Sequence, residues 1–179
     1  MTVILEEIVK YKVDILRKSK VKSKGIGEMS LDKGYTLIYS GVAEGEFAKE
    51  GAGFVVGEGL YKKMEDWEAI SPRIIKANFH LSRGKITLVQ HYAPTQDSSV
   101  IKKEQFYSDL ERITSKFKSM NRKIICFGDF NARTGWNYGN TFGVIGKHGG
   151  ERTKNENGQR LIDFCIENNI LILLLTVVA

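Results

Sequence analysis

The chain has 179 residues and 20.2 kDa, the length of one domain that can bury a substantial core. Its 42% hydrophobic and 27% charged residues are ordinary for a folded globular protein. The net charge of +6 suits a polyanionic partner and equally a merely basic protein with no such partner. The two cysteines, Cys126 and Cys165, lie in apolar runs, which predicts reduced core thiols in an intracellular protein and argues against a disulfide or zinc site.

Neither end of the chain has the pattern of a targeting or membrane segment. Glu6 and Glu7 interrupt the apolar residues where a signal peptide would need an uncharged core. The apolar stretch "ILILLLTVVA" (170–179) is far shorter than the ~20 residues of a membrane span. We expect no membrane association, a nuclear or cytoplasmic location, and a core element truncated at residue 179.

The first half of the chain predicts one helix and then mostly strands. In 4–16, Ile4, Leu5, Ile8 and Val9 share a helical face before an extended end. A basic loop is expected over 17–25, followed by glycine-bounded strands at 35–41 and 51–57. Alternating polarity predicts a strand over 74–81, and "SRG" (82–84) a hairpin turn into a strand over 85–95 that Pro94 ends.

The second half predicts two helices around one buried strand. Residues 104–117 place Phe106, Leu110, Ile113 and Phe117 at helical spacing. The run "IICF" (124–127) predicts a buried strand, and a glycine-rich loop covers 135–150. A short helix then carries the apolar residues of 161–165 and ends near 168–169. The pattern predicts one mixed α/β domain over 1–179, with central strands at 74–81, 85–93 and 123–129.

Asp129 and Asn131 follow the predicted strand and are two residues apart in "GDFN". In an extended segment, side chains at i and i+2 point to the same side, with Phe130 turned toward the core. Such a pair suits phosphodiester hydrolysis, because a carboxylate can deprotonate an attacking water and a carboxamide can stabilise the oxyanion. The structural alternative is an Asx-turn that closes the strand.

Longer motifs around this pair resemble a known family. The segments "GDFNARTG" and "GVIGKHGGERTKNENGQRLIDFCIENN", preceded by "VQHYAPT" and a helix, are similar to the endonuclease/exonuclease/phosphatase superfamily. In particular they resemble endonuclease domains of non-LTR (LINE-type) retrotransposons and related craniofacial development protein 2-like sequences. The resemblance implies a DNase I-like four-layer α/β sandwich, here expected to be incomplete at both ends. It also implies DNA cleavage with Mg²⁺ or Mn²⁺.

The resemblance implies a role for several residues of this chain. Asp129 matches the aspartate that activates water, Asn131 the asparagine that supports the transition state, and Tyr92 a tyrosine that contacts the scissile phosphate. Asp129 and Asn131 would hold the metal weakly. Arg73 occupies the place of a basic residue and is either a phosphate contact or a surface charge. His148 matches a loop histidine and receives no catalytic role.

One position departs from the pattern that the resemblance implies. Lys20 stands where relatives carry the glutamate that binds the metal, and an ammonium has no lone pair to coordinate a cation. The family's first asparagine strand and its terminal Asp-His pair are also expected to lie outside this chain. The basic tract with Lys20 and Lys22 is then either a phosphate-attracting loop or a solvated charge run.

Three interpretations follow from these residues. The first is an endonuclease-like phosphodiesterase domain of retrotransposon origin that acts on DNA with impaired activity. The second is a non-catalytic basic nucleic-acid-binding remnant, and the third is a non-functional product of a decayed element. An exposed sheet edge would also favour self-association.

Overall fold

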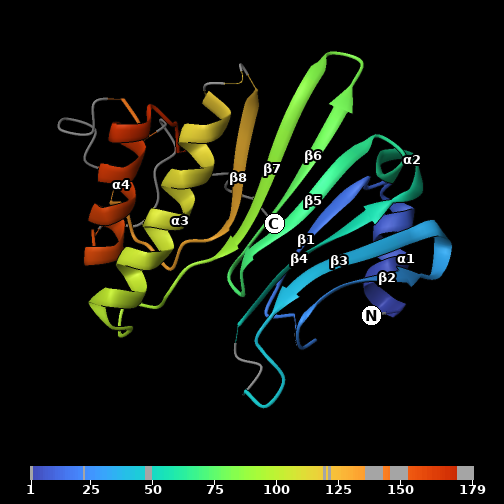
Figure 1. Cartoon of the computed structure of the whole chain (residues 1–179), viewed down its shortest axis with the longest axis horizontal. Coiled ribbons are helices and arrows are strands. Elements are labelled where there is room, and N and C mark those ends of the chain that lie inside the picture. The colour runs from blue at the N-terminus through green and yellow to red at the C-terminus, as the bar shows by residue number, and fades with distance from the viewer. Residues whose placement is uncertain are drawn as a thin grey trace. The chain divides into compact units, whose positions relative to one another are not determined.

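We describe residues 2–21, 23–46, 50–118, 120, 122–135, 143–145 and 153–172 of a computed structural model (Figure 1). The chain divides into two compact units, Met1–Tyr92 with Met120–Gly128, and Ala93–Ser119 with Asp129–Ala179. That all 179 residues form one domain stays a prediction.

The first unit contains two four-stranded sheets. One has the order β1-β4-β3-β2 and the other β5-β6-β7-β8. The strands are β1 (Ile15–Ser19), β2 (Ile26–Leu31), β3 (Tyr35–Gly41), β4 (Gly51–Gly57), β5 (Met64–Ser71), β6 (Ile74–Leu81), β7 (Gly84–Tyr92) and β8 (Lys123–Asp129). The paired registers of the first sheet, and those of β5 with β6 and β6 with β7, are antiparallel.

The two sheets bury one apolar core between them. Ile38, Phe54 and Val56 from the first sheet form one cluster with Ile75 and Phe79 from the second, and all are fully buried. This alternation of inward apolar residues is the period-two pattern expected of β6. At the crossing of β7 and β8, a Cβ on Gly128 would lie 2.1 Å from the carbonyl oxygen of His91, so only glycine allows this approach.

Helix α1 (Thr2–Lys10) covers the other face of the first sheet. Leu5 and Ile8 are buried there with Leu37 and Val55. The predicted apolar face was too wide, because Ile4 and Val9 are 36% and 42% exposed. A single turn, α2 (Glu58–Tyr61), and a 3-10 turn, η1 (Asp32–Gly34), connect strands of this unit.

The second unit contains the helix pair α3 (Val100–Lys118) and α4 (Glu156–Asn168). The four apolar residues predicted to share a face of α3 are all buried, as are Leu161, Ile162, Phe164 and Cys165 of α4. Helix α3 begins four residues earlier than predicted, at Val100. Asn169, with φ 52°, ends α4 in the left-handed conformation that asparagine tolerates.

The sequence predicted strands β3, β4 and β6, the strand conformation of β8 and the hairpin Leu81–Gly84 correctly, but other predictions were wrong. Strand β8 was predicted to be buried, but its residues are half-buried or exposed, and Ile125 is 50% exposed. Strand β1 extends to Ser19, into the segment predicted as a basic loop, and β2 and β5 were missed. Strand β8 lies at the end of its sheet within the described residues and is not central. Cys165 is buried, as predicted for a core thiol, whereas Cys126 is only half-buried.

Candidate functional site

Tyr92 and Arg73 hold each other at the end of β7 in the first unit. The main-chain N–H of Tyr92 donates to the carbonyl oxygen of Arg73 at 2.9 Å. Nη1 of Arg73 donates to the carbonyl oxygen of Tyr92 at 3.0 Å. This reciprocal pair ties the end of β7 to the turn between β5 and β6. Tyr92 itself is buried, with 8% of its surface exposed.

Two cations lie close to the ring of Tyr92. Nζ of Lys20 lies 5.5 Å from the ring centroid, and Cζ of Arg73 lies 5.6 Å from it. Each is within the range of a cation–π attraction, worth roughly 0.5–1 kcal/mol at an exposed site. Lys20 follows β1 directly and has φ 53°, so a left-handed turn directs the chain away from the strand. The structure therefore brings together three of the predicted residues: Lys20, Arg73 and Tyr92.

Arg73 forms an ion pair with Glu50. Its Nη2 contacts Oε1 of Glu50, and the two side chains are only 16% and 26% exposed. Glu50 and the Tyr92 carbonyl take up the guanidinium, so Arg73 is not a charge that meets only solvent. A phosphate contact by Arg73 stays a prediction. No periodicity or motif in the sequence points to Glu50, which lies 23 residues from Arg73 along the chain.

Gln90 is a buried polar residue that the sequence analysis missed. It is fully buried on β7, and its Nε2 donates to Oγ of Ser19 at 3.2 Å and to the carbonyl oxygen of Lys18 at 3.4 Å. These bonds anchor the end of β1, the segment that leads into Lys20. The only hint in the sequence was a polar residue at an inward position of an otherwise apolar strand end.

Asp129 and Asn131 lie together in the second unit as an Asx-turn. Oδ1 of Asp129 accepts a hydrogen bond from the main-chain N–H of Asn131 at 2.9 Å. Asn131 has φ 48°, so the expectation that both side chains project from one extended face is wrong. Nδ2 of Asn131 instead donates to the carbonyl oxygen of Ala93 at 2.8 Å. Phe130 turns inward as expected, packing edge-on against Phe106 at 6.5 Å between centroids.

Asn157 at the start of α4 fixes this turn and was also missed from the sequence. It is 3% exposed, and its Nδ2 donates to the carbonyl oxygens of Asn131 at 3.0 Å and Pro94 at 3.1 Å. One side chain thus clamps the segments after β7 and β8. Its position two residues into a helix, after the cap Asn155, gave no sequence signal for this contact.

The N-terminus of α4 also contacts the segment that follows Asn131, at Arg133. Oδ1 of Asn155 accepts from the main-chain N–H groups of Gly158 at 2.8 Å and Arg133 at 3.0 Å. A Cβ on Gly158 would lie 1.8 Å from the carbonyl oxygen of Arg133, so this contact requires glycine. Lys103, only 3% exposed, donates to the carbonyl oxygen of Gln96 at 2.8 Å and pairs with Glu156 at 3.5 Å. The Asp129 turn therefore rests on a dense polar network.

The donor set of the described residues does not fit a magnesium or manganese site. Among the described residues, no group of three or more His, Cys, Asp or Glu side chains lies close enough to hold a metal. Mg²⁺ requires an octahedral shell of oxygens, usually positioned by carboxylates. Asp129 already uses one oxygen in its turn, and Lys20 supplies an ammonium in place of a carboxylate. Lys22 and His148 lie outside the described residues.

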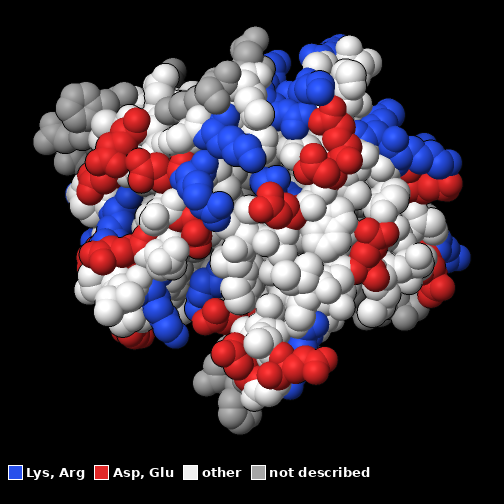
Figure 2. Space-filling model, viewed as in Figure 1, with Lys and Arg blue, Asp and Glu red and all other residues white. Residues whose placement is uncertain are grey.

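The charged residues on the face shown in Figure 2 are of both signs and interspersed, with no unbroken basic surface there. The net charge of +6 is therefore not evidence for a broad polyanion-binding patch on that face. None of the described helices combines the length and apolar character needed to cross a bilayer.

Comparison with known proteins gives a consistent result for sequence and fold. No protein-family model matches the chain. The chain is 28% identical over 172 residues to craniofacial development protein 2 of Bos taurus and of Tragulus javanicus. These matches cover 96% of the chain but 28% and 29% of the two relatives, so the chain spans less than a third of their length.

The fold is similar to the endonuclease domain of TRAS1, a telomere-specific non-LTR retrotransposon. The TM-score is 0.59 at 18% sequence identity, over 92% of this chain and 63% of that domain. The predicted resemblance to craniofacial development protein 2 and to the retrotransposon endonuclease fold is confirmed. The predicted DNase I-like α/β class is confirmed as well.

Proposed function

We propose that this chain is an endonuclease-like phosphodiesterase domain that binds DNA and has impaired metal-dependent cleavage. The observation that carries the proposal is the position of Lys20, whose ammonium lies beside the Tyr92 ring. From the resemblance we infer that Lys20 stands at the position of a metal-binding glutamate and that Tyr92 would contact the phosphate. A cation fixed there attracts a phosphate but cannot coordinate a metal.

The expected loss of cleavage follows from charge and coordination. In this class of reaction a divalent cation supplies several kcal/mol of transition-state stabilisation as a Lewis acid. Because residue 20 is a lysine, its side chain supplies no carboxylate to anchor the divalent cation. Asp129 is exposed and can orient a water, and Asn131 is held by Ala93 and Asn157. These two residues alone leave a weak site and a slow reaction.

DNA binding rests on the cations of the same region. Lys20 is exposed, so it can release a counterion when it meets a phosphate. Arg73 is neutralised by Glu50, so its contribution to affinity should be smaller than that of Lys20. Lys22 is proposed to add a further non-specific contact in the same basic tract.

The experiment is a nicking assay on supercoiled plasmid, with Mg²⁺, Mn²⁺ or EDTA, run beside a DNA-binding titration at several salt concentrations. We expect nicking near background and binding that weakens as salt rises. Lys20→Ala should lower the affinity for unrelated DNA sequences alike and reduce the salt slope by about one unit. Lys63→Ala, an exposed lysine on a strand connection, is the matched control for charge.

Lys20→Glu separates the metal argument from the DNA argument. This variant should bind Mn²⁺ more tightly than the parent chain, as measured by calorimetry, without restoring robust nicking. Strong Mg²⁺-dependent nicking by the unmodified chain, abolished by Asp129→Ala, would overturn the impairment. Absence of salt-dependent DNA binding would overturn the proposed substrate. Salt-dependent DNA binding by the unmodified chain, with nicking that is the same in Mg²⁺, in Mn²⁺ and in EDTA and is unchanged by Asp129→Ala, would favour the non-catalytic alternative.

A further inference from the structure

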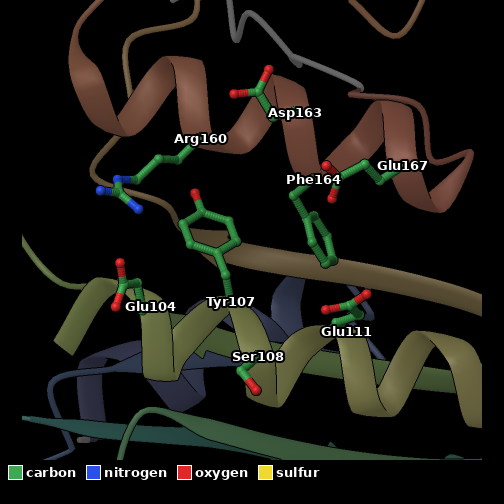
Figure 3. Close-up of a pocket in the computed structure, with 8 residues that line it drawn as sticks. All are labelled: Glu104, Tyr107, Ser108, Glu111, Arg160, Asp163, Phe164 and Glu167. Atoms are coloured by element: carbon green, nitrogen blue, oxygen red, sulfur yellow. The ribbon is translucent and has the colours of Figure 1, made fainter. Parts of the chain in front are cut away.

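A groove runs between α3 and α4 in the second unit, apart from Asp129 and its turn (Figure 3). Its volume is ≈ 320 Å³, at the lower end of the range for ligand pockets, about 300–1,000 Å³. Each helix contributes four residues at the spacing i, i+3, i+4, i+7, which is one helical face. The lining residues are Glu104, Tyr107, Ser108, Glu111, Arg160, Asp163, Phe164 and Glu167.

Two aromatic rings form the apolar part of the groove. Tyr107 and Phe164 point toward one another from the two helices (Figure 3), with ring centroids 5.6 Å apart and planes tilted by 51°. The hydroxyl oxygen of Tyr107 is buried and has no hydrogen-bond partner among the described residues. Burial raises the pKa of this hydroxyl, so it stays protonated at neutral pH. An unpartnered buried hydroxyl is costly unless a ligand group reaches it.

The walls of the groove carry four carboxylates against one guanidinium. The guanidinium of Arg160 is already bonded to Glu156 at 3.1 Å, outside the groove lining. Glu104, Glu111 and Glu167 are exposed on the two walls. Among the described residues, no three acidic side chains lie close enough to chelate a metal ion. The carboxylates are therefore placed to meet separate positive charges along an extended ligand.

We propose that this groove binds a basic segment of a partner protein, a stretch with lysine or arginine side chains repeated along one face. The argument is charge complementarity: the walls are acidic on a chain whose net charge is +6. The aliphatic stem of a lysine or arginine packs against Tyr107 and Phe164, and its head reaches the carboxylates. DNA is repelled by the same walls, so this site is independent of the proposed function.

The test uses a labelled alanine-based helical peptide with arginines four residues apart, titrated with the full chain by fluorescence anisotropy. We expect salt-sensitive binding, weakened about three- to tenfold by the double variant Glu111→Gln with Glu167→Gln. The matched control is Glu44→Gln with Glu46→Gln, which removes the same charge from an exposed connection outside the groove. The control should change the affinity less than about twofold.

A second readout follows amide chemical shifts in the full chain on addition of the peptide. Shifts that cluster on α3 and α4 around Tyr107 and Phe164 support the site. Equal weakening by the groove and control variants overturns it, as does equal binding of a peptide with glutamines in place of the arginines. Self-association that the groove variant abolishes would show that the occupant is a second copy and would also overturn the proposal.

Discussion

Nδ2 of Asn157 donates a hydrogen bond to the main-chain carbonyl oxygen of Asn131 at 3.0 Å, and Asn157 is buried, with only 3% of its surface exposed. The same nitrogen donates to the carbonyl of Pro94 at 3.1 Å. Asn157→Ala would leave both carbonyls without this donor. A buried group left without its partner costs about 1–3 kcal/mol, so we expect a loss of that size in the free energy of unfolding.

Urea denaturation of the variant and the parent chain measures this loss. Gln105→Ala, on an exposed face of α3, is the control and should change stability by less than about 0.5 kcal/mol. If Asn157→Ala loses no more stability than the control, the hydrogen bonds of Asn157 to Asn131 and Pro94 contribute nothing to the free energy of unfolding.

The Arg73–Glu50 ion pair should show strong coupling. Both side chains are mostly buried, so removing the guanidinium in Arg73→Met leaves the Glu50 carboxylate without its partner and frees the Tyr92 carbonyl. We expect Arg73→Met to destabilise the chain by roughly 1–3 kcal/mol, below the 3–5 kcal/mol of a fully buried pair. Arg73→Met with Glu50→Gln should recover part of that loss. A double-mutant cycle in urea measures the coupling, and purely additive effects would contradict it.

The two cysteines should differ in reactivity toward a thiol reagent. Burial raises the pKa of the Cys165 thiol to about 12, and only the thiolate attacks. We therefore expect Cys126 to react first at pH 8 and Cys165 to react only when the chain opens. Cys126→Ser and Cys165→Ser assign the two phases of the reaction with DTNB. Fast modification of Cys165 in the folded chain would contradict its burial.

The same shift gives Cys165 a pH-dependent contribution to stability. Its pKa in the folded chain lies above the ordinary thiol value of 9.0, so above about pH 9 the unfolded chain loses a proton that the folded chain keeps. The contribution is fully present below pH 9 and is lost as pH rises toward 12. Cys165→Ala should reduce the fall in stability over this window.

Exposed apolar residues on the outer strands predict self-association. Ile26 and Met29 of β2 are 64% and 48% exposed, and Ile125 of β8 is 50% exposed. In the described residues, β2 and β8 each end the strand order of their sheet. Such strands offer unpaired backbone groups and apolar side chains to a second copy. Sedimentation velocity should show association that rises with concentration and falls in Ile26→Lys with Met29→Lys. A sharp monomer at all concentrations would contradict this prediction.

The sequence determined the parts of the fold that depend on local patterns. The alternation in β6, the helical spacing of Phe106, Leu110 and Phe117, and the glycines around β4 each fix an element from its own residues. Strands β2 and β5 were not predicted, because local patterns do not specify them. β2 and β5 mix apolar with polar residues in no regular alternation and contain no buried residue, so their pairing with β3 and β6 decides their conformation.

The sequence also determined which residues could carry chemistry, since "GDFN", "HYAPT" and Lys20 are readable as motifs and as a departure from one. Only the tertiary structure decided what those residues touch. Arg73 is paired because the fold brings Glu50 to it, and Lys20 lies close to the Tyr92 ring because β1 ends beside β7. Asn131 is left-handed and bound by Asn157, 26 residues further along the chain. Hydrogen bonds and ion pairs between distant segments form only when folding has brought those segments together, and no local pattern in the chain encodes them.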